Sequence, residues 1–75
     1  MDKLDPILVA FGKNVRQWRT KRNLSQEALA EKASLDPTYI SGIERGLRNP
    51  GIKNVVRLAM ALGVTTSELV KGLKS

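Results

Sequence analysis

The sequence predicts an all-α protein, with one compact domain over residues 1–75 that consists of five short helices. Along most of the chain, apolar residues recur at three- and four-residue steps between signals for helix starts and helix ends. The chain contains one Trp, one Tyr and one Phe, so its core must consist mostly of Leu, Ile, Val and Ala, which suits packed helices. A chain of 75 residues can form one apolar core but not two.

The net charge and the missing residue types limit the classes of function that the chain can have. Thirteen Lys and Arg against seven Asp and Glu give a formal charge of +6, which attracts polyanions such as nucleic acid. The chain contains no Cys and no His, so disulfides and thiolate zinc sites are excluded and the commonest catalytic base is missing. No nucleophile–base set, phosphate-binding glycine loop or metal-ligand spacing is present. We therefore expect no enzyme activity, no metal and no cofactor.

No segment suits export or membrane insertion. The apolar run near the N-terminus covers only residues 7–11, far short of the roughly 20 apolar residues of a membrane span. Acidic residues and a proline precede it, unlike in a signal peptide. We expect a cytoplasmic protein with no membrane partner.

The first three helices are predicted from their start signals. Asp–Pro pairs at residues 5–6 and 36–37 each combine an N-cap with proline at the first helical position. Ser25 is a further candidate N-cap. These signals predict helices over about residues 6–22, 26–33 and 37–45. The first helix carries a basic stripe opposite its apolar face, either a solvated surface or a contact with a polyanion: Lys13, Arg16, Arg19, Lys21 and Arg22.

Two more helices are predicted after a loop rich in Gly, Asn and Pro. The stretch IKNVVRLAMAL has a broad apolar face and is followed by Gly63, a helix-stop signal. Thr65 and Glu68 have the spacing of a capping box, so a fifth short helix should begin near Thr66. Residues 63–75 carry more apolar surface than a frayed end would, which makes them a candidate dimerisation region. The candidate interface residues, for which packing inside the domain is the alternative, are Val64, Leu69, Val70 and Leu73.

The second and third predicted helices have the spacing of a helix-turn-helix over about residues 26–45. A short turn joins them, and the later helix begins with a polar cap. Ala30 lies where the two helix backbones come closest, a position that needs a small side chain. Apolar residues occupy the other positions at which such a pair must pack: Leu29, Ala33, Leu35, Ile40 and Ile43.

The segments FGKNVRQWR, SQEALA and YISGIERG resemble the lambda-repressor-like Xre family of DNA-binding regulators, over nearly the whole chain. Within that family, YISGIERGLRNPGIK is most similar to the restriction-modification controller proteins, small five-helix regulators that act as homodimers on paired operator half-sites. The resemblance implies a homodimeric, sequence-specific transcriptional regulator of double-stranded DNA, with a restriction-modification operon as a candidate target. RNA polymerase is a further candidate partner.

The alternative is a helix-turn-helix that binds other proteins, as in antitoxins or bridging factors. The basic residues Arg48 and Lys53 favour DNA. A protein-interaction module should tolerate the loss of these charges and depend instead on the apolar C-terminal helix.

The resemblance places the third helix in the major groove, where neutral polar side chains face the base edges and cations lie on the flanks. Tyr39 has the alternative of closing the edge of the core, and Ser41 and Lys53 of lying in solvent. Gly42 would let the helix lie deep in the groove. The residues expected on the outward side of the third helix are Thr38, Tyr39, Ser41 and Gly42. Those expected at phosphates are Gln26, at the start of the second helix, and Arg45, Arg48, Asn49, Lys53 and Asn54.

Two positions depart from the family pattern, and one pair is structural. Pro37 stands where controller proteins commonly have a base-reading arginine, so sequence recognition should depend on Thr38, Tyr39, DNA deformability or arginines from elsewhere in the fold. Ser34 stands at a turn position that usually has glycine in a left-handed conformation. Arg19 and Glu44 occupy the positions of an ion pair that in this family joins the first and third helices.

Overall fold

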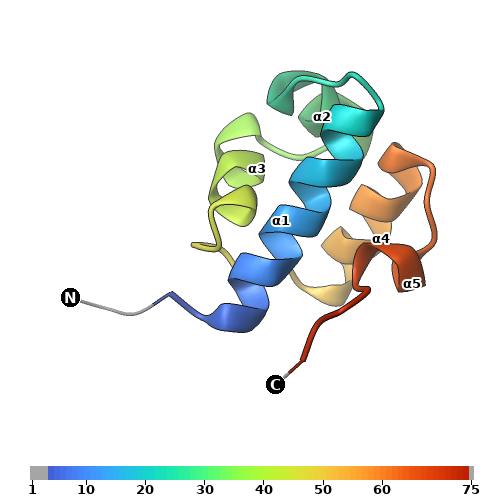
Figure 1. The fold of residues 1–75 in the computed structure, drawn as a ribbon. Helices are drawn as coiled ribbons and strands as arrows, with labels where there is room; N and C mark the ends of the chain where they lie inside the picture. Colours follow the sequence, from blue (N-terminus) through green and yellow to red (C-terminus); the bar gives the residue numbers. More distant parts are fainter. Residues whose placement is uncertain (1–3, 75) are drawn as a thin grey trace.

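Five α-helices follow one another in the computed structural model, which describes residues 4–74 of the chain. Within these residues there is no strand, and the predicted all-α fold of five helices is confirmed. In Figure 1, α1 crosses the front of the bundle, with α3 on one side and α4 and α5 on the other. The helices are α1 (Pro6–Lys21), α2 (Gln26–Ala33), α3 (Pro37–Glu44), α4 (Ile52–Leu62) and α5 (Thr66–Leu69).

The first three helices begin where predicted because side-chain caps satisfy their first backbone N–H groups. The Asp5 carboxylate accepts the N–H of Ile7 at 2.8 Å. The Asp36 carboxylate accepts the N–H of Thr38 at 2.7 Å. Ser25 caps α2 in the same way. Helices α1 and α3 end one residue earlier than predicted, with the next residue as the C-cap in each.

Helix α5 begins with the predicted capping box. The Thr65 hydroxyl accepts the N–H of Glu68 at 3.0 Å, and the Glu68 carboxylate accepts the N–H of Thr65 at 3.0 Å. The hydrogen bond from the Thr65 backbone lowers the pKa of the Glu68 carboxyl from its ordinary value, because it stabilises the charged form. Two reciprocal bonds therefore define the start of this four-residue helix.

All five helices contribute to one apolar core. Trp18 is only partly buried, and the Lys21 ammonium and the Arg22 guanidinium lie 4.9 Å and 5.3 Å from the centre of its ring. Both cations are thus within range of the ring's π face. The largest fully buried side chains are Val15 of α1, Leu29 of α2, Ile40 and Ile43 of α3, Leu58 and Leu62 of α4 and Leu69 of α5.

The C-terminal segment packs inside the domain more than the sequence predicted. Leu69 is 0% exposed, and Val64 and Leu73 are partly buried against the core. The prediction that Leu69 belongs to a dimer interface was therefore wrong, because this side chain is the contribution of α5 to the core. Among the four candidates, Val70 presents the most open surface, at 39% exposed.

Two polar side chains from the first helical segment hold the ends of the later helices. Asn14 Nδ2 donates to the carbonyl oxygens of Leu69 and Lys71, both at 2.9 Å. Arg22 Nε donates to the carbonyl oxygen of Leu62, the last residue of α4, at 2.9 Å. Carbonyl groups at helix ends lack partners within their own helix, so Arg22 satisfies the end of α4 and Asn14 joins the end of α5 to α1.

Glycine at position 12 lets α1 lie directly against the end of α3. A Cβ atom on Gly12 would meet the carbonyl oxygens of Ile43 and Glu44, the second at 2.6 Å. Both oxygens belong to the backbone of a packed helix, so neither can turn away as a side-chain end would. A Cβ atom on Gly46, just after α3, would lie 2.8 Å from Val9 Cγ2. The contact between α1 and α3 thus depends on the absence of two side chains.

We expect Gly12→Ala to lower the free energy of unfolding by about 1–3 kcal/mol, because the added methyl group overpacks the crossing of two helices. Urea denaturation monitored by circular dichroism measures the change. Gly51→Ser is the matched control, because a Cβ atom at Gly51 meets no atom within 4 Å and serine is a good N-cap. Equal stability of the two variants would show that the crossing relaxes freely.

Candidate nucleic-acid interface

The turn between α2 and α3 has the geometry of a helix-turn-helix. Ser34 follows α2 with φ 57° and ψ 44°, the left-handed conformation that the family pattern implies at this position. For serine this conformation costs about 1 kcal/mol. The N–H of Leu35 donates to the carbonyl oxygen of Ala30 at 2.9 Å, which closes the end of α2. Ala30 and Ala33 are both buried, so the two helices meet through small side chains.

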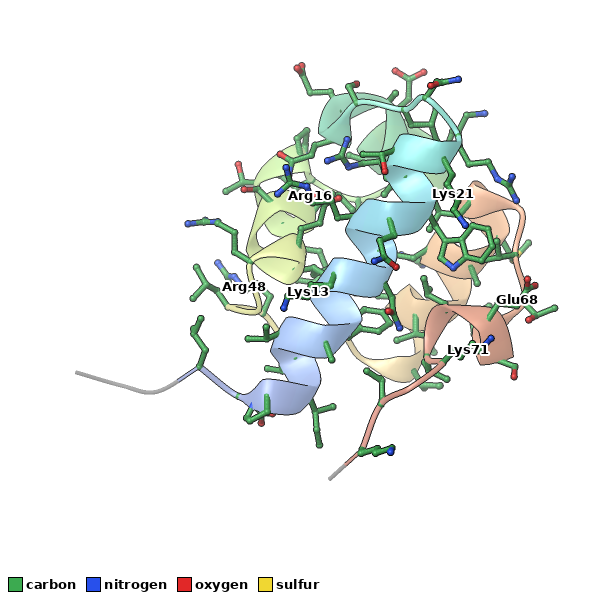
Figure 2. All side chains as sticks on the ribbon, viewed as in Figure 1. Lys13, Arg16, Lys21, Arg48, Glu68 and Lys71 are labelled. Carbon is green, nitrogen blue, oxygen red and sulfur yellow. The ribbon has the colours of Figure 1, made fainter. Side chains whose placement is uncertain are left out.

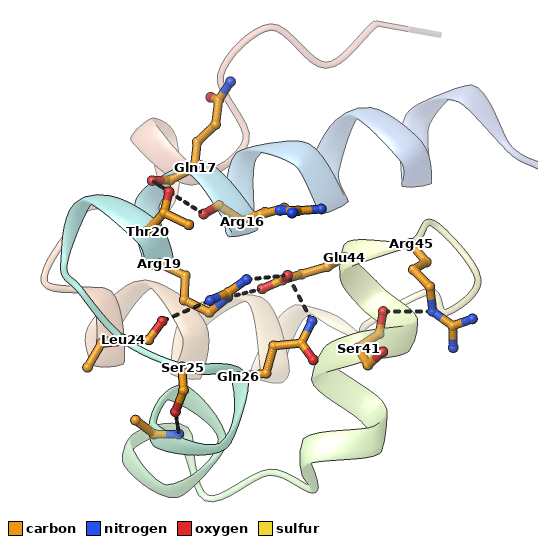
Figure 3. A network of polar contacts seen from close by, with 11 residues as sticks. Arg16, Gln17, Arg19, Thr20, Leu24, Ser25, Gln26, Ser41, Glu44 and Arg45 are labelled. Atoms are coloured by element: carbon orange, nitrogen blue, oxygen red, sulfur yellow. Dashed lines mark hydrogen bonds and ion pairs between the residues drawn. The ribbon is translucent and has the colours of Figure 1, made fainter.

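An ion pair joins α1 to the end of α3, as expected for Arg19 and Glu44 (Figure 3). Arg19 Nε donates to Glu44 Oε2 at 2.6 Å, and Arg19 Nη2 donates to Glu44 Oε1 at 3.1 Å. Arg19 Nη1 donates to the carbonyl oxygen of Leu24 at 2.8 Å, just before α2. The Arg19 and Glu44 side chains are only 13% and 3% exposed. The Arg19 guanidinium therefore joins α1 to both ends of the helix-turn-helix, the segment just before α2 and the end of α3.

Gln26, the first residue of α2, also contacts this pair. Its Nε2 donates to Glu44 Oε1 at 3.1 Å. An amide nitrogen carries two hydrogens, so this contact orients the side chain and leaves a second hydrogen for another acceptor. Backbone N–H groups at the start of a helix also favour an anion. The phosphate contact expected for Gln26 stays a prediction.

The exposed side of α3 is polar and carries no charge between its ends. Thr38 is exposed, and Ser41 is half-buried. The Tyr39 side chain packs against the core, as one of its two predicted roles requires, and its hydroxyl accepts a hydrogen bond from Asn54 Nδ2 at 3.2 Å. The Tyr39 hydroxyl hydrogen is not used in that bond, so it can be donated to a phosphate. Asn54 thereby links α4 to α3. The DNA contact of Tyr39 stays a prediction.

Gly42 is not on an open outward surface, which corrects the prediction. It is buried, and the side chain of Arg48 lies over it. A Cβ atom on Gly42 would be 2.7 Å from Cγ of Arg48. The sequence could not indicate this contact, because Arg48 reaches α3 from the loop that follows it.

The flanks of α3 carry exposed cations. Arg45 caps its C-terminal end, and its Nε donates to the carbonyl oxygen of Ser41 at 3.4 Å. Arg48, Asn49 and Lys53 are exposed in the loop before α4 and in its first turn. Within residues 4–74, Arg19–Glu44 is the one ion pair, so the charges on the flanks are free to meet phosphates.

The structure divides the basic stripe of α1 and its C-cap into three groups. Arg19 is paired with Glu44, whereas Lys21 and Arg22 lie against Trp18 at the other side of the domain. Figure 2 shows Lys13 and Arg16 on the same side of the molecule as Arg48. Arg16 lies one turn from both Gly12 and Arg19, which contact α3, and it therefore adjoins the helix-turn-helix.

Lys13 and Arg16 are site candidates that the sequence did not separate from the rest of the stripe. The available signal was their spacing from Arg19, which the family pattern already placed against the third helix.

Among the described residues no group of acidic side chains suits a metal ion. In the same part of the chain no helix is long and apolar enough to cross a membrane.

The fold and the turn geometry define a class of protein, and a sequence comparison agrees. The chain belongs to the helix-turn-helix family, whose profile matches residues 15–69. In solved structures of similar proteins the fold is the lambda-repressor-like arrangement predicted from the sequence.

Two similar proteins narrow this class to controllers of restriction-modification systems. The chain is 48% identical to control protein C.BamHI of Bacillus amyloliquefaciens over 65 residues, which cover 85% of this chain and 80% of that protein. Its structure resembles the restriction-modification controller protein C.AhdI from Aeromonas hydrophila, with a TM-score of 0.82 and 47% identity over 83% of this chain and 94% of that chain.

A third comparison includes a nucleic acid. The structure resembles that of SinR, a master regulator for biofilm formation, in complex with DNA, with a TM-score of 0.78 and 34% identity over 81% of this chain and 98% of that chain. The resemblance to the Xre family and its controller proteins is confirmed, and the chain is a DNA-binding transcriptional regulator.

We expect Arg19→Ala to lower the free energy of unfolding by about 3 kcal/mol, because it leaves the buried Glu44 carboxylate without its cation. Urea denaturation at pH 7 measures the loss. The double variant Arg19→Leu/Glu44→Leu should recover part of the stability, since it removes both charges. If the double variant is no more stable than the single one, the cost arises from lost packing rather than from an unpaired charge.

Proposed function

We propose that this regulator binds an operator of double-stranded DNA as a homodimer, with one α3 helix in the major groove of each half-site. The observation that carries the proposal is the neutral polar exposed face of α3, which follows a turn of helix-turn-helix geometry and precedes three cations that are unpaired within residues 4–74, Arg45, Arg48 and Lys53. Such an arrangement leaves base contacts to short polar side chains and phosphate contacts to the flanks. The likeness to C.BamHI and C.AhdI supports a restriction-modification operon as the target.

The residues that contact DNA under this proposal come from three places. The exposed face of α3 supplies Thr38, Tyr39 and Ser41. Gln26 binds a phosphate from the start of α2, aligned by Glu44. Phosphate contacts on the other side of α3 come from the residues between its C-cap and the first turn of α4: Arg45, Arg48, Asn49, Lys53 and Asn54.

Dimerisation follows from the reach of one short helix. A helix of eight residues covers only a few base pairs, so a single copy cannot select one site in a genome. Two copies related by a two-fold axis read half-sites whose centres lie roughly 34 Å apart or at a multiple of this distance.

The dimer surface that we propose is an apolar stripe along α4. Ile52, Val56 and Met60 follow each other at four-residue steps and are 76%, 39% and 76% exposed. They point away from the core, to which the same helix contributes Leu58 and Leu62. A self-complementary patch of this kind suits a two-fold interface. This stripe replaces the buried Leu69 in the proposal, and Val70 remains a separate candidate at the C-terminal end.

RNA polymerase is the further partner that we propose. The acidic residues Glu27 and Glu31 are exposed on α2. They would remain accessible to a protein partner when α3 occupies the groove.

Selection from a random DNA pool, followed by a salt titration, tests the function. We expect a site with two half-sites, and a log–log slope of affinity against salt that falls by about one unit in Arg48→Ala. Lys71→Ala is the matched control, because it removes the same charge from the opposite side of the domain (Figure 2). Failure to enrich any sequence, with weak binding that depends only on salt, would favour a protein-interaction module instead.

Sedimentation equilibrium tests the interface. We expect Met60→Glu to raise the Kd of dimerisation roughly 30-fold or more, because it places two like charges across a two-fold axis and removes apolar contact. Gln17→Glu changes the charge equally at an exposed position of α1 and should have little effect. If Val70→Glu separates the dimer and Met60→Glu does not, the interface lies at the C-terminal end, as the sequence predicted.

A further inference from the structure

Gly42 of α3 and Arg48 of the loop after it lie in direct contact. Gly42 lies within α3, and a Cβ atom there would be 2.7 Å from Cγ, 3.6 Å from Nε and 3.7 Å from Cδ of Arg48. These three atoms are its nearest neighbours outside the local backbone. The aliphatic stem of Arg48 therefore occupies the place where any other residue at position 42 would carry its side chain.

The backbone beneath Arg48 is tied to α3, so the contact is built into the loop. The N–H of Leu47 donates to the carbonyl oxygen of Gly42 at 2.9 Å, and the N–H of Gly46 donates to that of Ile43 at 3.0 Å. Gly46 has φ +76°, a left-handed conformation that suits the end of a helix. Pro50, two residues beyond Arg48, is buried. The loop is thus held on both sides of Arg48.

Helix α3 contains no cation of its own among residues 37–44. The guanidinium groups nearest to its exposed face must come from outside the helix, and the Arg48 side chain lies against Gly42, in the C-terminal half of α3. A free arginine loses rotamer entropy when it binds, whereas an arginine already laid against a surface loses less.

Glycine is the weakest helix former after proline, so its presence inside an eight-residue helix needs a compensating gain. We propose that Gly42 is a positioning residue. Because it has no side chain, the aliphatic part of Arg48 can pack against α3, and this packing directs the Arg48 guanidinium toward the DNA. This inference rests on the proposed function and deepens it.

A double-mutant cycle tests this positioning role by measuring the affinity for DNA selected by the wild-type protein. Gly42→Ala should weaken binding by about fivefold or more, because the new methyl group displaces Arg48, whereas in an Arg48→Ala background it should have no further effect. The same cycle with Lys53→Ala is the control and should be additive, because Lys53 does not touch Gly42. The melting temperature of Gly42→Ala should be unchanged or higher, since alanine favours the helix and an exposed arginine can turn aside.

Relaxation of the Arg48 side-chain ¹⁵Nε, measured without DNA, gives an independent readout. We expect a lower order parameter in Gly42→Ala than in the wild type, and an equal value in the two would overturn the proposal. Equal loss of affinity from Gly42→Ala with and without Arg48 would also overturn it, and would indicate that glycine only lets the helix approach the groove. A wild-type protein that selects no DNA sequence would refute the proposed function, while the relaxation result would still decide whether Gly42 positions Arg48.

Discussion

The ion pair between Arg19 and Glu44 is the constraint on which the arrangement of the helix-turn-helix depends. Two parallel hydrogen bonds join the side chains, and both are almost excluded from water. A buried charge without its partner is strongly unfavourable, so the helices must place these two groups together. Because Arg19 also holds the carbonyl oxygen of Leu24, and Glu44 also holds Gln26, the same pair sets the start of α2 relative to the end of α3.

Other contacts extend this constraint along α3. Gly12 allows α1 to touch the carbonyl oxygens at the end of α3, and Asn54 holds the hydroxyl of Tyr39 near its start. The helix that faces DNA in our proposal is therefore aligned by neighbours at both ends. Such alignment reduces the conformational entropy lost on binding. The partly buried Arg19 and Glu44 neutralise each other, whereas the exposed cations beside α3 have no ion-pair partner among the described residues and are free to bind phosphates.

Apolar residues of α4 and α5 are divided between the core and the surface. Leu69 completes the core, while Asn14 binds the carbonyl oxygens at the end of α5. Helix α4 then has more apolar surface than the core can cover, and Ile52 and Met60 remain exposed. A chain of 75 residues can bury only part of its apolar surface, so the surplus lies on a second face of α4, where another copy of the chain can cover it.

Local signals in the sequence were sufficient to predict the number, order and starts of the helices, because caps, proline and glycine act over two to four residues. The family pattern added the pairing of Arg19 with Glu44 and the left-handed conformation at Ser34. The contacts of Arg48 with Gly42 and of Asn14 with the end of α5 join residues from different segments, and no local pattern encodes them. Leu69 and Met60 both lie in apolar stretches, yet one is buried and the other exposed, because burial depends on how many neighbouring helices surround a position in three dimensions.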